Sequence, residues 1–600
     1  MADETSSTPA VVAGGWPVIS LAQAHAQLTA PGAPFEIVQR EIRGVLTRTW
    51  KNAPPTLRDL FVGALRFRAR EFLIYEDDRA TYDSFAKAAI TLAHRLQDDG
   101  VRKGDRVAII MRNLPEWPVC FWAAVLAGAT VTPLNAWWTS SELEYGLTDC
   151  GAKIALVDGE RFEANAEMLE GLAGLERVYV ARFPDSGAEI SAKARGLESV
   201  IGAVKVWCDL PQRPMPDVSF DPEDDATILY TSGTTGKPKG ALGTHRNFTS
   251  NITTLEISAA RTRLRAGEPL PEVDPMDAPQ AVALLVVPLF HATGLSATLG
   301  PIMSAGGKLV LMRRWDPEQA MQLIEREKVT STGGVPTIAW QLAEHPARSK
   351  YDLSSLGAVS YGGAPAAPEL VRTLAKAFPG SLPGTGWGMT ETTGTFTIHV
   401  GREYANRPES AGPAAPVGEM QVRDPGDGQT ILASGRIGEL WVKGPQIVKG
   451  YWNKPEATAE TFQEGWLRTG DLVKVDTEGF LFIVDRAKDM LIRGGENIYC
   501  VEVENALFDH PDVIDAAVVG IPHRTLGEEP AAVVHLRPTA ATTEAELREY
   551  VRERLAAFKV PVKVAFWPEP LPRNANGKIV KTQLKALFAA EALTTEARSP

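Results

Sequence analysis

The chain has 600 residues, 44% of them hydrophobic and 23% charged, a composition that is ordinary for a globular protein and excludes a largely disordered one. By length it has room for about four domains. Acidic residues outnumber basic ones by 74 to 62, and the resulting net charge of -12 excludes a general nucleic-acid binder.

Four cysteines, at Cys120, Cys150, Cys208 and Cys500, lie far apart and form no C-x-x-C pair. This pattern is typical of a reducing compartment and offers no metal-ligand spacing. The N-terminus lacks a basic leader, and the longest apolar runs, such as 281–290, are shorter than the roughly 18 residues of a membrane-spanning helix. We therefore expect a cytoplasmic protein without a transmembrane segment.

Residues 1–50 form an N-terminal extension whose role the pattern does not reveal. From about residue 75 to 365, short β-branched runs alternate with amphipathic stretches, which is typical of strand–helix units wound on parallel sheets. The clearest strands are predicted over 106–110, 154–158 and 308–312, and the clearest helices over 84–99 and 317–327. This large region is therefore predicted to be α/β.

Residues 230–240 read YTSGTTGKPKG and follow an apolar run at 226–229. This order predicts a strand that opens into a phosphate-binding loop, because glycines let backbone N–H groups turn toward an anion, hydroxyls donate hydrogen bonds and lysines neutralise charge. The G-x-x-x-x-G-K-[ST] phosphate loop is absent, since Gly233 and Gly236 stand too close together. On composition alone, a Ser/Thr/Gly surface loop is the alternative.

Beyond about residue 405, short strands with Gly/Pro-rich connections predict a small β-rich subdomain that reaches to about 487. It includes a hairpin with strands near 472–475 and 480–484. After residue 488 the order of predicted helices and strands changes and indicates a compact α+β unit. Its expected elements are helices over 500–508 and 543–556 and strands over 516–519 and 531–536.

We therefore expect an α/β protein with three parts. These are the extension 1–50, a large N-terminal domain 51–487 with parallel sheets and the β-rich subdomain, and a small α+β C-terminal domain 488–600.

Further segments follow the phosphate loop in an order that one family uses. They are PLFHATG at 288–294, YGGAP at 361–365, GWGMTE at 386–391, GWLRTGD at 465–471, DRAKDMLIRGGENIYCV at 485–501 and PRNANGK at 572–578. Over about residues 57–583 the chain closely resembles the adenylate-forming superfamily of acyl-CoA synthetases, luciferases and peptide-synthetase adenylation domains. The shared order of the motifs carries the resemblance, because each alone is weak.

The resemblance implies an AMP-forming acid–CoA ligase that uses ATP, Mg²⁺ and coenzyme A. A carboxylic acid attacks the α-phosphate to give acyl-AMP and pyrophosphate, and coenzyme A then gives acyl-CoA and AMP. Since anions must be brought together, positioning and charge stabilisation are the main protein contributions. The expected partners are these small molecules and no nucleic acid, and a homodimer is the assembly we consider.

For the first half-reaction, the resemblance makes Lys578 the cation that bridges the acid and the α-phosphate. Glu391 would bind magnesium beside Thr390, and Asp471 would hold the ribose with help from Arg486. Outside these motifs, Glu391 would be a helix-start carboxylate and Lys578 a solvated surface lysine. The implied ATP-binding residues are Thr231, Ser232, Gly233, Thr234, Thr235, Gly236, Lys239, Gly363, Ala364, Pro365, Gly386, Trp387, Gly388, Asp471 and Arg486.

Two positions depart from the family pattern. Trp387 stands where tyrosine is most frequent, and its indole offers a larger face for adenine. Cys500 stands where proline is frequent, and we expect it to pack as a small hydrophobe rather than act as a nucleophile.

For the second half-reaction, the resemblance implies that the C-terminal domain is mobile. It would turn about a hinge at Lys488 and bring Gly494, Gly495 and Glu496 to the thiol tunnel, where glycine-rich backbone suits close approach to pantetheine.

His291 bears on the identity of the acid. It matches a histidine that lines the acid pocket of acyl- and aryl-CoA ligases, whereas amino-acid adenylating relatives place an aspartate nearby. The candidate pocket segments, 291–300, 334–340 and 359–363, are apolar and rich in small residues, with no fixed charge. We expect a medium- or long-chain fatty acid, with an aryl, cinnamoyl-like or steroid-derived acid as the nearest alternative.

Three other functions stay open at this point. An acyl-AMP ligase that loads a carrier protein would differ by not forming a thioester with free coenzyme A. Luciferase-like oxygenation has no specific support in the sequence. A non-catalytic nucleotide-binding or scaffold protein is disfavoured by the joint presence of Glu391, Asp471, Arg486 and Lys578.

Overall fold

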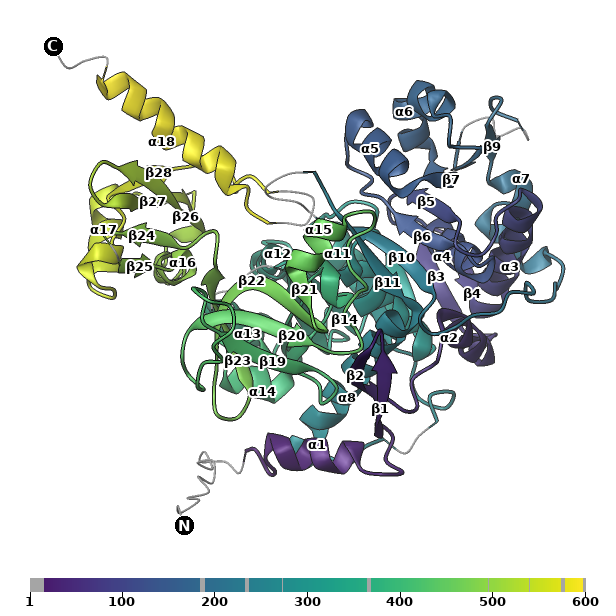
Figure 1. The fold of residues 1–600 in the computed structure, drawn as a ribbon, viewed down its shortest axis with the longest axis horizontal. Coiled ribbons are helices and arrows are strands. Elements are labelled where there is room, and N and C mark those ends of the chain that lie inside the picture. Colours follow the sequence, from purple (N-terminus) through teal and green to yellow (C-terminus); the bar gives the residue numbers. More distant parts are fainter. Residues whose placement is uncertain are drawn as a thin grey trace.

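The computed structural model describes residues 16–183, 189–231, 237–271, 274–363, 368–494, 496–538, 540–573 and 578–596. Among the expected site residues, those at 232–236, Ala364, Pro365 and Gly495 lie outside the described residues. Figure 1 shows a large body of sheets and helices, with a smaller domain, labelled β24–β28 and α16–α18, set to one side.

A seven-stranded sheet occupies the first half of the large body and is parallel except for the edge strand β11. Its β-branched strands are buried between layers, as parallel strands require. In spatial order the strands are β11 (Gly240–Thr244), β10 (Asp225–Tyr230), β6 (Thr130–Pro133), β5 (Arg106–Ile110), β7 (Ala152–Asp158), β8 (Arg177–Ala181) and β9 (Ala194–Gly196).

An eight-stranded sheet forms the second layer, with antiparallel strands only at its two edges. In spatial order its strands are β17 (Thr397–Val400), β16 (Leu382–Trp387), β15 (Ala358–Gly362), β14 (Ser331–Gly334), β12 (Val282–Leu285), β13 (Lys308–Leu311), β3 (Glu71–Tyr75) and β4 (Asp78–Thr81). The β3–β4 hairpin thus joins strands that follow it by two hundred residues or more.

The main hydrophobic core lies between the two sheets and contains residues of both. Helix α4 (Glu116–Leu126) is buried all round, which suits its sequence, since every residue after Glu116 is apolar. Its Trp117, Phe121 and Trp122 are fully buried, and Phe121 packs edge-on against Trp122 with ring centroids 5.4 Å apart.

The helices otherwise cover the faces of the sheets and connect their strands. In chain order they include α2 (Leu57–Ala64), α3 (Tyr82–Asp98), α5 (Ser140–Cys150), α6 (Gly159–Gly171), α7 (Glu198–Ile201), α8 (His245–Arg265), α9 (Ala292–Gly294), α10 (Gly300–Ser304), α11 (Pro317–Glu327), α12 (Pro336–Glu344), α13 (Pro368–Ala377), α14 (Gly401–Asn406) and α15 (Pro455–Thr461). The helix expected over 317–327 is confirmed as α11, where Asp316 caps the first turn and Pro317 begins it.

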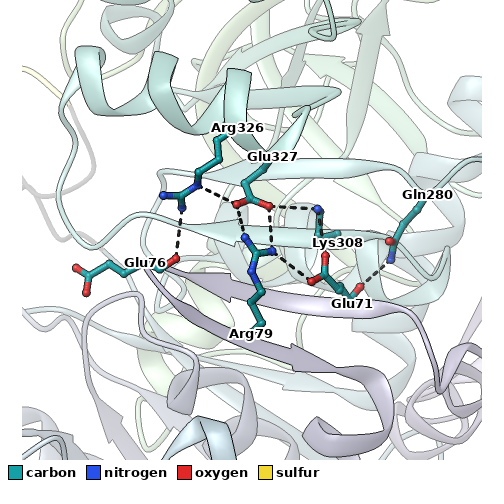
Figure 2. A network of polar contacts seen from close by, with 7 residues as sticks. All are labelled: Glu71, Glu76, Arg79, Gln280, Lys308, Arg326 and Glu327. Atoms are coloured by element: carbon teal, nitrogen blue, oxygen red, sulfur yellow. Dashed lines mark hydrogen bonds and ion pairs between the residues drawn. The ribbon is translucent and has the colours of Figure 1, made fainter.

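An ion-pair network fastens the β3–β4 edge to the end of α11 (Figure 2). The Glu327 carboxylate accepts hydrogen bonds from both terminal nitrogens of Arg79, at 2.7 and 3.2 Å, and from Lys308 at 3.3 Å. Glu71 also contacts Arg79 and Lys308. Because Glu327 is buried and the cations reach it from separate elements, this network fixes the register of the edge.

The β-rich subdomain is confirmed as an antiparallel sheet. Its strands are β18 (Gly412–Pro413), β23 (Phe480–Arg486), β22 (Trp466–Val475), β20 (Gly438–Lys443) and β19 (Glu419–Arg423), with β21 (Phe462–Gln463) beside β22. The N-terminal extension lies against it. Helix α1 (Leu21–Thr29) and a hairpin of β1 (Ile37–Ile42) and β2 (Val45–Trp50) contribute Leu28 and Trp50 to a cluster with Ile257, Ala415 and Val417.

The small C-terminal domain follows β23 and has its own core. Its elements are β24 (Leu491–Arg493), β25 (Glu496–Ile498), α16 (Cys500–Phe508), β26 (Val513–His523), β27 (Gly527–Leu536), α17 (Glu544–Arg552), β28 (Lys563–Phe566) and α18 (Lys581–Glu596). An ion pair at 3.2 Å between Arg537 of this domain and Glu344 of α12 links it to the large body, and both side chains are exposed.

The expected fold class is confirmed, with parallel sheets in the large N-terminal part and a smaller α+β domain after it. None of the described helices combines the length and the apolar character needed to cross a bilayer.

Candidate active site

The expected phosphate loop connects β10 to the antiparallel edge strand β11. Residues 231 and 239 therefore lie beside each other at the same end of these two strands. Its two described ends hold each other. The Thr231 N–H donates to the Lys239 carbonyl at 2.9 Å, and the Lys239 N–H donates to the Thr231 hydroxyl at 3.3 Å. The Lys239 ammonium lies 4.7 Å from the ring centroid of Tyr451, a cation–π contact.

Glu391 stands in a single 3-10 turn, Thr390–Thr392, directly after β16. Its side chain is 6% exposed, and its Oε1 accepts a 2.7 Å hydrogen bond from the Tyr451 hydroxyl. Its backbone carbonyl accepts from the Val448 N–H at 3.1 Å. Both ends of the residue are therefore held by one segment of chain.

The donor set around Glu391 fits magnesium rather than a metal that needs an all-protein cage. The described residues contain no group of three or more acidic, histidine or cysteine side chains that could enclose a metal ion. The second oxygen of Glu391 accepts no hydrogen bond from a described residue. Mg²⁺ typically takes one or two carboxylates together with phosphate oxygens and water, which this single carboxylate allows.

Asp471 and Arg486 face each other across the β22–β23 ladder. The Arg486 Nε lies 3.0 Å from Asp471 Oδ1, and the Trp387 indole N–H donates to Asp471 Oδ2 at 2.7 Å. Asp471 is 4% exposed. The three residues come from two different sheets and form one polar cluster.

The glycines of the expected adenine site serve close packing of the chain. A Cβ on Gly386 would lie 2.6 Å from the Thr397 carbonyl oxygen, and one on Gly388 would overlap the Gly394 carbonyl. Gly363 has a positive φ of 75°, which suits glycine at the turn after β15. Because glycine has no side chain, neighbouring strands and turns can pack closely against the backbone at these positions.

Lys578 lies within the electrostatic field of this cluster. Burial lowers the pKa of its ammonium to about 8, and Arg486 and Lys488 also lower it, while Asp471 and Glu391 raise it. The structure therefore brings Lys578 together with the carboxylates that the sequence placed in the same site. Its ammonium loses its proton about two pH units more readily than an exposed lysine.

His291 begins the first turn of the segment expected to line the acid pocket. Burial, with a smaller contribution from the charge of Lys578, lowers the pKa of its imidazole to about 3, so the ring is neutral at pH 7. Its Nε2 is buried and has no hydrogen-bond partner among the described residues. The ring packs against Phe290, which in turn packs edge-on against Trp137.

Of the residues expected to serve coenzyme A, Gly494 follows β24 and Glu496 begins β25 in the smaller domain, whereas Lys488 acts on the pKa of Lys578 and so lies near the cluster. Lys488, Gly494 and Glu496 are exposed, and the Gly494 N–H donates to the Leu526 carbonyl at 2.7 Å. Within the described parts of the chain, neither Gly494 nor Glu496 makes a hydrogen bond or ion pair with Glu391 or His291. In this arrangement of the domains, it is Lys578 that lies within the field of the two carboxylates.

Cys500 is the first residue of α16, and its N–H donates to Asp485 Oδ2 at 2.5 Å. A proline at this position could not make that bond. The thiol is buried, which raises its pKa, and it donates to the Asp489 carbonyl at 3.0 Å. The expectation of a packed rather than nucleophilic cysteine fits this environment.

Tyr451 is a site residue that the sequence did not identify. It orients the Glu391 carboxylate and supports Lys239, although it lies 60 residues from the first of these in the chain. No local pattern marks it. Tyr451 is brought to the site by its pairing with Ala241 of β11, a contact that exists only in the folded chain.

Comparison with known proteins identifies the family. Residues 61–452 match the model of the AMP-binding enzyme family, and residues 502–578 match that of the AMP-binding enzyme C-terminal domain. A feruloyl-CoA synthase of Amycolatopsis is 35% identical over 85% of this chain and 94% of its own length. A long-chain-fatty-acid–CoA ligase of Bacillus subtilis is 32% identical over 87% of this chain and 92% of its own.

The fold agrees with a solved structure, o-succinylbenzoate coenzyme A synthetase from Bacillus subtilis in complex with ATP and magnesium ion. The TM-score is 0.70 and the identity 30%, over 88% of this chain and 99% of that one. Sequence, fold and family models thus agree, and the chain belongs to the AMP-binding enzyme family as an adenylate-forming, AMP-forming acid–CoA ligase.

Proposed function

We propose that this enzyme activates a medium- or long-chain fatty acid, first as its acyl-adenylate with release of pyrophosphate and then as its coenzyme A thioester with release of AMP. The observation that carries the catalytic part is the position of Lys578 in the field of Glu391 and Asp471. A lysine from the smaller domain is there within reach of the charges of two carboxylates of the large body, which supports ATP-dependent activation of an acid.

In the first half-reaction, an oxygen of the acid forms a bond to the α-phosphorus and the bond to pyrophosphate breaks. Thr231 to Gly236 and Lys239 bind the leaving phosphates, and Thr390 donates to the α-phosphate. Glu391 would hold Mg²⁺, which neutralises charge on the phosphates when bound. The Lys578 ammonium stabilises the two anions as they meet, and neutral His291 leaves the acid carboxylate free to approach.

The Trp387–Asp471–Arg486 cluster supports binding of the nucleoside. Both Asp471 oxygens keep a free lone pair after accepting from Trp387 and Arg486, so they can accept from the two ribose hydroxyls. Of the glycines expected to frame the adenine, Gly363 has open space where a side chain would stand, so the adenine face could lie there.

In the second half-reaction, the thiol of coenzyme A attacks the acyl carbon and AMP leaves. We assign the boundary between the large domain and the lid to Lys488, so that rotation there removes Lys578 and brings Gly494 to Glu496 to the thiol. The proposed parts remain 1–50, 51–487 and 488–600, with a cytoplasmic location and a homodimeric assembly as predictions.

The choice of a fatty acid is supported by the three segments expected to line the acid pocket. They contain no aspartate, glutamate, lysine or arginine, so no fixed charge selects a second polar group on the acid. The Tyr361 hydroxyl is 2.8 Å from that of Tyr404 and so is engaged away from the pocket. An aryl or cinnamoyl-like acid is the second candidate, which the likeness to a feruloyl-CoA synthase favours.

The test is pyrophosphate release by the purified enzyme with a panel of saturated fatty acids, cinnamic-type acids, amino acids and acetate. We expect acid-dependent release with fatty acids of medium or long chain and a thioester on addition of free coenzyme A. Turnover only with amino acids or acetate would overturn both candidates. Release of pyrophosphate without a thioester would instead point to loading of a carrier protein.

The Lys578→Ala variant tests the site. We expect adenylation to be abolished while supplied acyl-adenylate is still converted to the thioester. Equal loss of both half-reactions would show that the assignment of Lys578 is wrong.

A further inference from the structure

The hairpin of the N-terminal extension ends in a tight turn that aims an arginine at the body of the enzyme. Ile42 pairs with Val45, so the turn has two residues, Arg43 and Gly44, with φ of 52° and 77°. Positive φ at both positions is typical of a type I′ turn, which matches the twist of its strands. The Arg43 guanidinium Nη2 donates to the Ile447 carbonyl at 3.1 Å.

Ile447 belongs to the 445–452 segment, an irregular stretch between β20 and α15. On the side of the hairpin, the Ile447 carbonyl accepts from Arg43 and also from the buried Asn247 side chain at 2.9 Å. Asn247 donates as well to the Pro445 carbonyl at 2.7 Å. Both lone pairs of the Ile447 oxygen are thus engaged, one by the extension and one by α8.

On its other side, the 445–452 segment holds the groups proposed to act on ATP. The Val448 N–H, next to Ile447 in the chain, donates to the Glu391 carbonyl at 3.1 Å. The Thr393 hydroxyl donates to the Gln446 carbonyl at 2.8 Å. The Tyr451 hydroxyl bonds Glu391 Oε1, and its ring lies under Lys239.

The segment also fixes the strand that ends the phosphate loop. The Lys449 N–H donates to the Leu242 carbonyl at 2.8 Å, and the Leu242 N–H donates to that of Gly450 at 2.9 Å. The Trp452 N–H donates to the Gly240 carbonyl at 2.7 Å. Any shift of the segment would therefore move the magnesium carboxylate and the base of the phosphate loop together.

We propose that Arg43 is a positioning residue of the adenylation half-reaction, which acts through the 445–452 segment on Glu391 and Lys239. The inference rests on the proposed function for the roles of those two residues. It assigns a role to the extension, which lies outside the region that the family model matches, since the matched residues begin at 61.

The extension has a second attachment to the enzyme. It allows a positioning role of Arg43 to be distinguished from a general stabilising role of the hairpin. Arg48, on β2, donates to the Gly418 carbonyl at 3.3 Å and lies 3.9 Å from Glu419. Val45 packs on Gly465, where a Cβ would be 2.8 Å from the valine. These contacts attach the hairpin to the β-rich subdomain without touching the 445–452 segment.

The experiment compares Arg43→Ala with Arg43→Lys, Arg48→Ala and Arg40→Ala. Arg40 is exposed on the same hairpin, and its side chain makes no hydrogen bond or ion pair within the described residues. We expect Arg43→Ala to lower the rate of acid-dependent pyrophosphate release about tenfold, less than the roughly 100-fold that a 1 Å misplacement can cost. The concentration of Mg²⁺ at half-maximal rate should rise by a similar factor, and Arg43→Lys should restore part of both.

Three readouts separate positioning from a general structural role. Conversion of supplied acyl-adenylate to thioester and the Tm should stay at wild-type values in Arg43→Ala. Arg48→Ala should lower the Tm more than it changes the Mg²⁺ requirement, and Arg40→Ala should change neither. Equal loss of both half-reactions with a lower Tm, or an Arg43→Ala variant that matches Arg40→Ala, would overturn the inference.

Binding of Mg-ATP by calorimetry, without any acid, keeps the inference testable if the proposed substrate is wrong. We expect Arg43→Ala to weaken binding of Mg-ATP severalfold and binding of ATP in EDTA by a smaller factor, because only the part that depends on Lys239 remains without the metal. Wild-type enzyme that binds Mg-ATP but releases no pyrophosphate with any acid would contradict the proposed function alone. Unchanged Mg-ATP binding in Arg43→Ala would contradict the role of Arg43 alone.

Discussion

The indole N–H of Trp387 donates a 2.7 Å hydrogen bond to Asp471, and the two residues come from different sheets. A tyrosine ring at position 387 has no donor at the place of this N–H. The bond therefore joins the residue proposed to contact adenine to the residue proposed to hold the ribose. The departure from the family pattern at this position thus changes a polar contact as well as a stacking surface.

Replacing Trp387 by phenylalanine keeps an aromatic ring and removes the donor. A hydrogen bond to a charged acceptor contributes about 1.5–3 kcal/mol, of which Arg486 and water would recover part. We expect KM for ATP to rise about tenfold with a smaller change in kcat. Trp207→Phe is the control, because this buried indole donates to the Gly202 carbonyl at 3.1 Å, outside the site. A rise in KM shared by both variants would contradict the prediction.

Removing the Tyr451 hydroxyl should loosen the Glu391 carboxylate. In Tyr451→Phe the ring still supports Lys239, but Glu391 Oε1 loses its donor. We expect the Mg²⁺ requirement of adenylation to rise about fivefold, in keeping with roughly 1 kcal/mol for one hydrogen bond. Tyr351→Phe is the matched control, since the same type of bond there, 2.9 Å to Glu318, lies in another part of the molecule. An unchanged Mg²⁺ titration would show that Tyr451 does not orient Glu391.

The titration of Lys578 should appear in the pH profile of adenylation. Burial lowers its pKa to about 8, so the ammonium that stabilises the reacting anions is lost as pH rises through that value. We expect kcat/KM for adenylation to fall above pH ~8, approaching tenfold per pH unit. In kcat the fall should come at higher pH, because bound triphosphate favours the ammonium. Thioester formation from supplied acyl-adenylate should lack this limb, and an adenylation profile flat to pH 10 would be inconsistent with the assignment.

The network at the β3–β4 edge should contribute stability that depends on pH (Figure 2). Burial alone would raise the pKa of Glu327, but Arg79, Arg326 and Lys308 together lower it to about 2. The folded pKa lies below the unfolded value of about 4.5, so the stabilisation is fully present above pH ~4.5 and is lost as pH falls toward 2.

We therefore expect Glu327→Gln to lower the free energy of unfolding at pH 7 by about 2 kcal/mol, between the values for exposed and buried pairs. Urea denaturation at pH 7 and pH 3.5 would measure it, with a smaller difference from wild type at the lower pH. Glu76→Gln is the control, because the Glu76 side chain points away from the network (Figure 2) and a surface change there should cost less than 0.5 kcal/mol. A difference that grows on acidification would contradict the sign.

Much of the fold follows from local patterns. The helices over 317–327 and 500–508 and the strand over 106–110 have the predicted bounds, since capping residues and apolar runs define them locally. The helix expected over 543–556 ends earlier, at Arg552. The sequence did not reveal that β3 and β4 join strands of the second half of the chain, because pairing partners so distant leave no local signal.

The site likewise contains residues that motifs predict and residues that only the fold reveals. Motifs predicted roles for Glu391, Asp471 and Lys578, and in the fold both carboxylates act on the pKa of Lys578. The roles of Tyr451 and Arg43 could not be predicted, because each depends on a single contact between segments that no motif connects. The hydrogen bond of Trp387 was missed for a related reason. Its partner is chosen by how two sheets pack, and the sequence suggested only stacking.

The ion pair between Arg537 and Glu344 has a consequence for experiments on turnover. Both side chains are exposed, so the pair contributes about 0–1 kcal/mol and weakens as ionic strength rises. It belongs to the arrangement in which Lys578 lies within the field of the carboxylates. Salt should therefore shift the population of this arrangement by no more than about fivefold, so potassium chloride concentration becomes a mild means of changing which of the two proposed chemical steps limits the rate.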